Sequence, residues 1–172
     1  IEELKVKGRP VAFTPNRDTL IITGSEDIKG LENAIELVEE LKHQPRWLSG
    51  SALILNDDWE LFAPDMDHPL AASVRRLHLE SLRKRMKSAI PTLPSVQSNK
   101  AVVADFEIAF DTDERTYFSY SHWHMDQNTL LPVVDELRLF DKKGMFAAAS
   151  FEEVFDALDG RLNQVEGMYP TV

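Results

Sequence analysis

Residues 121–127 read SHWHMDQ and place two imidazoles and a carboxylate at alternate positions. Imidazole nitrogens and carboxylate oxygens can hold zinc without thiolate ligands, and this chain has no cysteine. Alternate side chains of a β-strand share one face, so His122 and His124 would lie together. Asp126 would join them if the strand continues or if its end folds back. A zinc site made of His122, His124 and Asp126 is therefore one hypothesis.

The segment resembles the HxHxDH motif of metallo-β-lactamase-fold hydrolases, with His122, His124 and Asp126 in register. The resemblance implies a metal-dependent hydrolase in which the ion generates a hydroxide nucleophile. Gln127 stands where the motif has its final His, and no His follows His124 in the chain. Because catalytic zinc normally takes three protein ligands, we favour the other interpretation, two structural histidines at a strand end. Our first expectation is thus no cofactor, with zinc as the alternative.

A second candidate site is a basic run in a helix expected from Pro69 to about Ser88. Four of its basic residues share one helix face at 100° per residue: Arg76, Arg83, Lys84 and Lys87. Glu80 lies on the same face, so this face can also be a solvent-exposed one with ion pairs at i,i+4 spacing. The alternative is a patch that binds an acidic protein partner.

The charge balance limits which partners the chain can bind. It has 172 residues, with 29 acidic against 19 basic side chains and a formal net charge of −10. A negative field of this kind repels phosphate backbones, so a nucleic-acid partner is not expected. No apolar run approaches the roughly 20 residues that a membrane span needs, so membrane insertion is not expected either.

The order of two β-rich runs, a turn and a helix occurs three times along the chain. The paired runs fall within residues 11–23, 52–62 and 136–149, and a further hairpin is expected over residues 102–124. Hairpins outnumber the alternating strand-helix-strand order that a parallel sheet needs. We therefore predict an α+β fold, with a mostly antiparallel sheet built from successive β-hairpins and helices packed on one face.

The first helix is predicted over about residues 26–43, with Ser25 as its N-cap. Its apolar residues recur at helical spacing and should be buried on one face: Ile28, Leu31, Ile35 and Val38. A capping-box pattern, Ser150 followed by Glu153, predicts the start of the last helix.

We expect a single domain over residues 1–172, since halves of this chain would each have a marginal core. Residues 91–99 read PTLPSVQSN and are the candidate subdomain boundary, because prolines and small polar residues interrupt both helical and strand periodicity. The first residues, IEELK, read like the last turns of a helix. A further N-terminal segment is therefore expected in the full protein.

Residues 8–27 read GRPVAFTPNRDTLIITGSED, and with the predicted helix after them they resemble the C-terminal end of the bacterial YtpQ-like proteins of unknown function. The resemblance covers about the first quarter of the chain. It implies a bacterial cytoplasmic protein and supplies no catalytic residue. The leading functional hypothesis is a non-catalytic interaction module, the alternative is the metal-dependent hydrolase, and the oligomeric state stays open.

Overall fold

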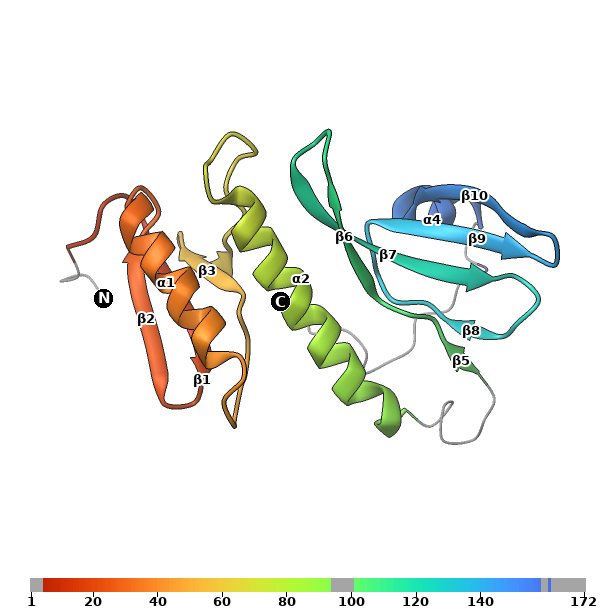
Figure 1. The fold of residues 1–172 in the computed structure, drawn as a ribbon, viewed down its shortest axis with the longest axis horizontal. Helices are drawn as coiled ribbons and strands as arrows, with labels where there is room; N and C mark the ends of the chain where they lie inside the picture. The colour runs from red at the N-terminus through yellow and green to blue at the C-terminus, as the bar shows by residue number, and fades with distance from the viewer. Residues whose placement is uncertain (1–4, 94–100, 159–160, 162–172) are drawn as a thin grey trace. The chain divides into compact units, whose positions relative to one another are not determined.

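The structure, a computed structural model, describes residues 5–93, 101–158 and 161 (Figure 1). These residues form an α+β fold with mostly antiparallel sheets, which confirms the predicted fold class. The chain divides into two compact units, one of Ile1–Ser81 with Thr112–Thr116 and one of Leu82–Asp111 with Tyr117–Val172. The division at Ser81 precedes the predicted boundary at 91–99, of which residues 94–99 lie outside the described residues.

The first unit contains a four-stranded sheet of order β2-β1-β3-β4. The strands are β1 (Pro10–Asn16), β2 (Thr19–Gly24), β3 (Ala52–Leu55) and β4 (Trp59–Leu61). All three neighbouring pairs are antiparallel, with Val11 opposite Thr23 of β2 and opposite Ile54 of β3. Both hairpins predicted in this part of the sequence are therefore confirmed.

Helices α1 (Ile28–Leu41) and α2 (Ala71–Ala89) contribute to the core of the first unit. The core combines strand and helix residues: Val11, Phe13, Leu31, Ala34, Ile35, Val38, Ala52, Ile54, Phe62, Val74 and Leu77. Leu31, Ile35 and Val38 are buried as predicted, whereas Ile28 is only half-buried. Ile28 is the first residue of α1, and that position leaves part of its side chain exposed.

The N-cap of α1 is Asp27, so the prediction of Ser25 was wrong. The Asp27 carboxylate accepts a hydrogen bond from the Gly30 backbone N–H at 3.2 Å. The Ser25 hydroxyl instead accepts from the Arg9 backbone N–H at 3.0 Å. Because the helix begins at Ile28 rather than near residue 26, the capping position falls on Asp27, and Ser25 is left to pair with the chain that precedes β1.

The second unit contains a four-stranded sheet of order β10-β9-β7-β6. Its strands are β6 (Glu107–Asp111), β7 (Thr116–His124), β9 (Glu136–Asp141) and β10 (Gly144–Ser150). The hairpin of β9 and β10 is antiparallel as predicted, but β7 and β9 run parallel, with His122 opposite Arg138. The predicted strand over 102–110 is interrupted, since β5 (Val102–Val103) leaves to pair in parallel with β8 (Thr129–Leu130).

Helix α4 (Phe151–Ala157) begins at the predicted capping box. The Ser150 hydroxyl accepts from the Glu153 backbone N–H at 3.1 Å, and the Glu153 carboxylate accepts from the Ser150 backbone N–H at 2.8 Å. A 3₁₀ turn, η1 (Ile90–Thr92), follows α2. In the described part of the chain, no helix is both long and apolar enough to cross a lipid bilayer.

Candidate functional site

Strand β7 positions the histidines of the SHWHMDQ segment. Ser121 is fully buried, and alternation along the strand therefore places His122 and His124 on the opposite face. The imidazole Nδ1 of His122 lies 2.6 Å from Oδ2 of Asp105, which precedes β6. The His122 backbone N–H donates to the other oxygen of the same carboxylate at 2.8 Å. The structure thus builds a carboxylate–imidazole pair from Asp105 and His122.

The electrostatics of Asp105 follow from these contacts. Burial by itself would raise the pKa of Asp105, because a low dielectric disfavours the charged carboxylate. The backbone N–H and the imidazole of His122, together with the Ser121 hydroxyl, outweigh burial and lower the pKa of Asp105. Asp105 is therefore held as a carboxylate that fixes one nitrogen of the His122 ring.

His124 and Asp126 do not join this pair in one ligand set. The His124 ring packs on Phe140 with 5.1 Å between ring centroids, and Asp126 is exposed in the turn after β7. That turn is closed by the Gln127 backbone N–H, which donates to the His124 carbonyl at 3.1 Å. Within residues 5–93, 101–158 and 161, no three His, Asp or Glu side chains are grouped so that they could share a metal ion.

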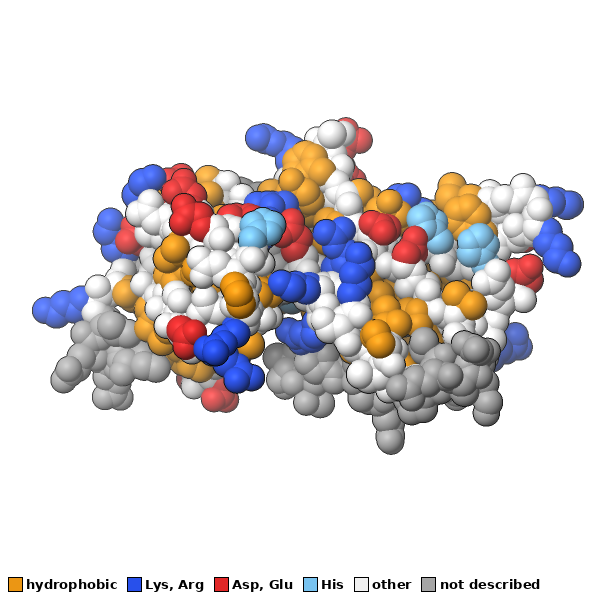
Figure 2. Space-filling view, turned by 60° about the horizontal axis from the view of Figure 1, so that its bottom comes forward, with side chains coloured by type: hydrophobic (Ala, Val, Ile, Leu, Met, Phe, Trp, Pro, Cys, Tyr) orange, Lys and Arg blue, Asp and Glu red, His pale blue; other side chains and the backbone are white. Residues whose placement is uncertain are grey.

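Aromatic rings from β7 and β9 surround the two histidines. His122 lies edge-on between Tyr120 at 5.4 Å and Phe140 at 5.3 Å, measured between ring centroids. The Arg138 guanidinium lies 3.8 Å above the Tyr120 ring and pairs with Glu136 at 2.7 Å. Reasoning from sequence missed Arg138 and Phe140, because their strand was predicted but its parallel partner was not. In Figure 2, histidine, carboxylate and hydrophobic atoms reach the surface side by side.

A small pocket of about 260 Å³ lies beside the pair. It is lined by Asp105, both histidines, Gln127, Thr129 and the chain at residues 102–104. An imidazole oriented by a carboxylate can accept or donate a proton at its other nitrogen. The adjacent Ser121 hydroxyl is fully buried and lies 3.4 Å from Asp105, so it is not aligned as a nucleophile for His122.

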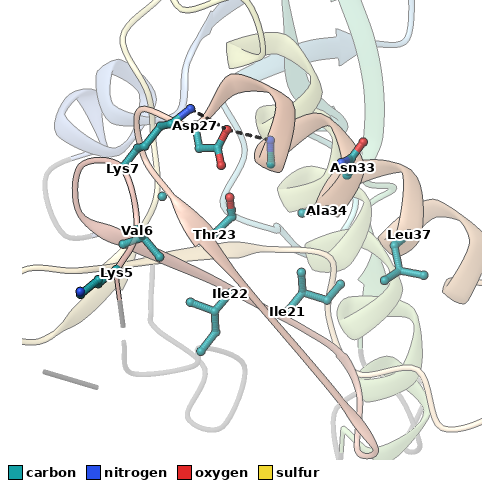
Figure 3. A pocket seen from close by; sticks show the side chains of 12 residues that line it. Lys5, Val6, Lys7, Ile21, Ile22, Thr23, Asp27, Asn33, Ala34 and Leu37 are labelled. Atoms are coloured by element: carbon teal, nitrogen blue, oxygen red, sulfur yellow. Dashed lines mark hydrogen bonds and ion pairs between the residues drawn. The ribbon is translucent and has the colours of Figure 1, made fainter. Parts of the chain in front are cut away.

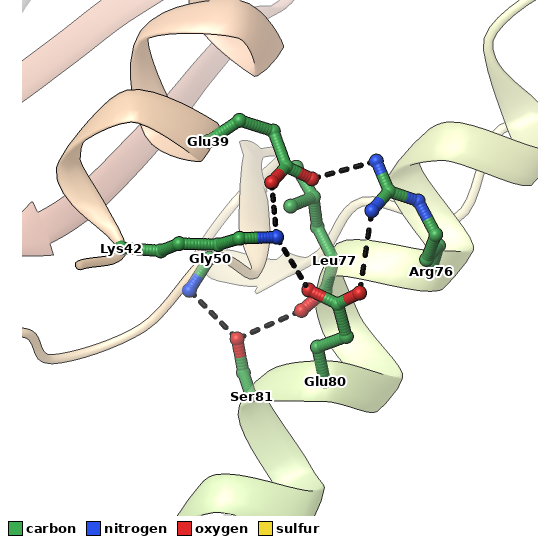
Figure 4. Close-up of polar contacts among 7 residues, drawn as sticks. All are labelled: Glu39, Lys42, Gly50, Arg76, Leu77, Glu80 and Ser81. Atoms are coloured by element: carbon green, nitrogen blue, oxygen red, sulfur yellow. Dashed lines mark hydrogen bonds and ion pairs between the residues drawn. The ribbon is translucent and has the colours of Figure 1, made fainter. Parts of the chain in front are cut away.

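The four basic residues of α2 that were predicted to bind a partner fall into two groups, according to the contacts that they make. Arg76 lies 2.6 Å from the Glu39 carboxylate of α1 and 3.2 Å from Glu80 one turn along α2 (Figure 4). Lys42 also pairs with Glu39, and it lies 3.4 Å from Glu80. Arg76 thus belongs to a network of two cations and two carboxylates that joins α1 to α2 within the first unit.

The pKa values of this network shift in the directions expected of ion pairs. Burial would raise the pKa of Glu39, but the hydrogen bond from Lys42 and the charge of Arg76 outweigh it and lower that pKa. The hydrogen bond to Glu39 raises the pKa of Lys42 against the effect of desolvation, and the charge of Glu80 raises it further. Both groups are therefore charged at neutral pH, and Arg76 is held between two carboxylates.

The other predicted binding residues lie towards the C-terminal end of α2. Arg83 Nη1 is 4.0 Å from the Glu107 carboxylate, with about a third of the Arg83 side chain exposed. Lys84 and Lys87 are exposed, and Lys87 lies in the last turn of the helix. Arg83, Lys84 and Lys87, called the basic patch below, thus remain near the surface, whereas Arg76 is engaged in the network.

No protein-family model matches the chain significantly, and neither does any curated protein or solved structure. The resemblance of residues 8–27 to the YtpQ-like proteins therefore stays a prediction.

Proposed function

We propose that the protein is a non-catalytic interaction module that binds an acidic protein partner through the basic patch on α2. The observation that carries this proposal is the surface position of Arg83, Lys84 and Lys87, three of the four cations within residues 83–87. A local positive patch in a chain of net charge −10 would attract an acidic surface and orient it during encounter. Nucleic acid is the poorer partner, because the rest of the charge opposes a phosphate backbone.

The helix dipole offers a structural explanation for part of this patch. A cation in the last turn of a helix is stabilised by the partial negative charge of the C-terminus, and Lys87 is in that turn. Arg83 and Lys84 precede the last turn, and the dipole effect decreases within one turn. The proposal therefore depends on Arg83 and Lys84 as well as Lys87. The resemblance to the YtpQ-like proteins supports a bacterial cytoplasmic setting for the module.

The test is the triple charge reversal Arg83→Glu, Lys84→Glu and Lys87→Glu, with a fluorescently labelled polyglutamate peptide as the acidic probe. Binding to the unmodified protein should weaken as salt rises, and the variant should bind at least roughly tenfold more weakly. Fluorescence anisotropy at several salt concentrations measures both effects.

A matched control carries the same change of charge on exposed cations elsewhere, Arg17→Glu, Lys142→Glu and Lys143→Glu. This control should keep most of the affinity. An equal loss in both variants would show that only net charge matters, and unchanged affinity in the first variant would refute the proposal.

The metal-dependent hydrolase remains the second candidate, and the Asp105–His122 hydrogen bond is the observation that favours it. A histidine that ligates a metal almost always donates its other ring N–H to a carboxylate, a backbone carbonyl or a water, and the Asp105 carboxylate fits this pattern. His122, His124 and Asp126 would then have to converge on one ion through a change of the turn after β7. Zinc retained by the protein through dialysis and lost on His124→Ala would favour the hydrolase over the interaction module.

A further inference from the structure

Strand β2 forms one edge of the first-unit sheet, and within the part of the chain that the structure describes this edge lacks the usual protection. Its sequence, TLIITG, has no charge and no proline over six residues, and among the described strands it pairs only with β1. The opposite edge, β4, has three residues with Glu60 in the centre. Proteins protect free edges by shortening them or by adding charge and proline, because an open edge can pair with another chain. In this sheet β4 shows such protection and β2 does not.

A groove of about 570 Å³ lies alongside this edge, between β2, α1 and the chain at residues 5–7 (Figure 3). Its apolar walls include Ile21 and Ile22 of the strand and Ala34 and Leu37 of the helix. Leu37 has 39% of its surface exposed. An exposed Leu beside an open strand edge gives a groove that can take both a backbone and apolar side chains.

Two glycines build the end of the groove near the C-terminus of β2. A Cβ atom on Gly24 would lie 2.0 Å from the Lys7 carbonyl oxygen, and one on Gly30 would lie 2.3 Å from Oγ1 of Thr23. The chain at residues 5–7 and the first turn of α1 can therefore approach the strand closely. The Lys7 carbonyl also accepts a hydrogen bond from the Glu26 backbone N–H at 3.1 Å, which fixes this approach.

This end of the groove is positively charged. Lys5 and Lys7 both line it, and the Lys7 side chain is 76% exposed. The acidic residue in the lining is Asp27, whose carboxylate caps α1 and lies 4.0 Å from Lys7 Nζ. Lys5 and Lys7 together carry two positive charges, and Asp27 carries one negative charge. This end of the groove therefore has a net positive charge that can attract a carboxylate of a ligand.

We propose that this groove binds an extended peptide segment of a partner protein, which adds to β2 as a further strand. In an antiparallel ladder alternate residues of β2 direct their N–H and C=O groups away from β1, where an added strand would bond them. Alternate aliphatic side chains of the segment contact the groove wall at Leu37, and an acidic residue at one end meets Lys5 and Lys7. The peptide groove and the basic patch on α2 are separate sites, so one can fail without the other.

The probe is the hexapeptide acetyl-Glu-Val-Thr-Val-Thr-Val-amide, which places its carboxylate near the lysines when it runs antiparallel to β2. Binding is measured by NMR titration, with amide hydrogen exchange as the second readout. The added strand should slow the exchange of β2 amides. Of two versions that are N-methylated at alternate residues, one should lose binding and the other should keep it, because only alternate amides of a strand face its neighbour.

Variants of the protein test the groove wall and its charge. Leu37→Glu should weaken binding at least roughly tenfold, a loss of about 1.4 kcal/mol. Leu61→Glu on β4, where 37% of the side chain is exposed, is the matched control and should keep the affinity. The double variant Lys5→Glu and Lys7→Glu should weaken binding of the Glu peptide but not of a peptide with Gln in its place. The triple variant of the basic patch should bind the hexapeptide normally.

Four results would overturn the proposal. Equal loss with both N-methylated peptides, or unchanged exchange of β2 amides on binding, would show that the peptide does not pair with the strand. Absence of binding by the unmodified protein would do the same. Protection of β2 that grows with protein concentration without peptide, together with a dimer in sedimentation, would assign the edge to a second copy of this chain instead.

Discussion

The role of Asp105 depends on contacts with residues that are distant in sequence. Asp105 lies 17 residues before His122, yet its carboxylate binds both the ring and the backbone of that histidine. The Ser121 hydroxyl adds a longer contact at 3.4 Å to the same carboxylate. Asp105 therefore holds the first histidine of SHWHMDQ in place and connects β7 to the chain between β5 and β6.

We predict that Asp105→Asn lowers the free energy of unfolding at pH 7 by about 1 kcal/mol, an amount kept small because 38% of the side chain is exposed. The folded state lowers the pKa of Asp105 below the ordinary value of about 3.9. Its stabilisation is therefore present above that ordinary pKa and is lost as pH falls through the lowered pKa. Urea unfolding over a pH series should show a steeper acid loss in the unmodified protein than in Asp105→Asn.

Asp126→Asn is the matched control, since Asp126 is exposed in the turn after β7. It should leave the pH dependence unchanged. If Asp105→Asn and the unmodified protein lose the same free energy of unfolding as the pH falls, this result would contradict the role given to the Asp105 carboxylate.

At the scale of secondary-structure elements, α1 shows how capping and tertiary contact compete for neighbouring polar side chains. Ser25 and Asp27 are both good N-cap residues. The chain that precedes β1 engages Ser25 through the Arg9 backbone N–H, and the Asp27 carboxylate accepts the hydrogen bond from the Gly30 N–H at the helix start. The start of α1 is therefore determined jointly by the helix and by the sheet beside it.

We predict that Asp27→Ala lowers the free energy of unfolding by about 1 kcal/mol, because it removes the cap and exposes an unpaired backbone N–H at the helix start. Thermal and urea unfolding measure this loss. Glu26→Ala replaces the exposed neighbouring carboxylate and should change stability by less than about 0.5 kcal/mol. Equal effects of the two substitutions would mean that helix-dipole charge, rather than the cap bond, stabilises this end.

At the scale of the whole molecule, the chain divides into two compact units. Leu77 is buried in the core that α1 and α2 share with the first sheet. Leu137 of β9 is fully buried in the second unit. The two leucines therefore report on different units of the same chain.

We predict that Leu77→Ala and Leu137→Ala each cost about 3 kcal/mol through lost burial and a cavity. Hydrogen exchange measured by mass spectrometry should quicken mainly in β1, β3 and α1 for the first variant and in β7, β9 and β10 for the second. Uniform acceleration in both variants would instead establish the single cooperative domain expected from chain length.

Local interactions account for the parts of this fold that the sequence by itself determines. The Arg17–Asp18 turn between β1 and β2, the spacing of Leu31, Ile35 and Val38, and the capping box at Ser150 all act over a few residues. Such patterns specify where hairpins and helices form, because the backbone preferences and hydrogen bonds that produce them lie within one element. The α+β class follows from counting these hairpins.

Tertiary structure alone decided which elements meet and hence which side chains cluster. The parallel pairing of β7 with β9 brings Arg138 and Phe140 to His122, and nothing within either strand specifies that partner. The packing of α2 on α1 turns Arg76 from a candidate binding residue into a partner of Glu39. Contacts between residues distant in sequence depend on how the hydrophobic faces of helices and strands pack on one another. The spacing of apolar residues in the sequence shows which face of each element is hydrophobic, but it does not show which other element that face packs against.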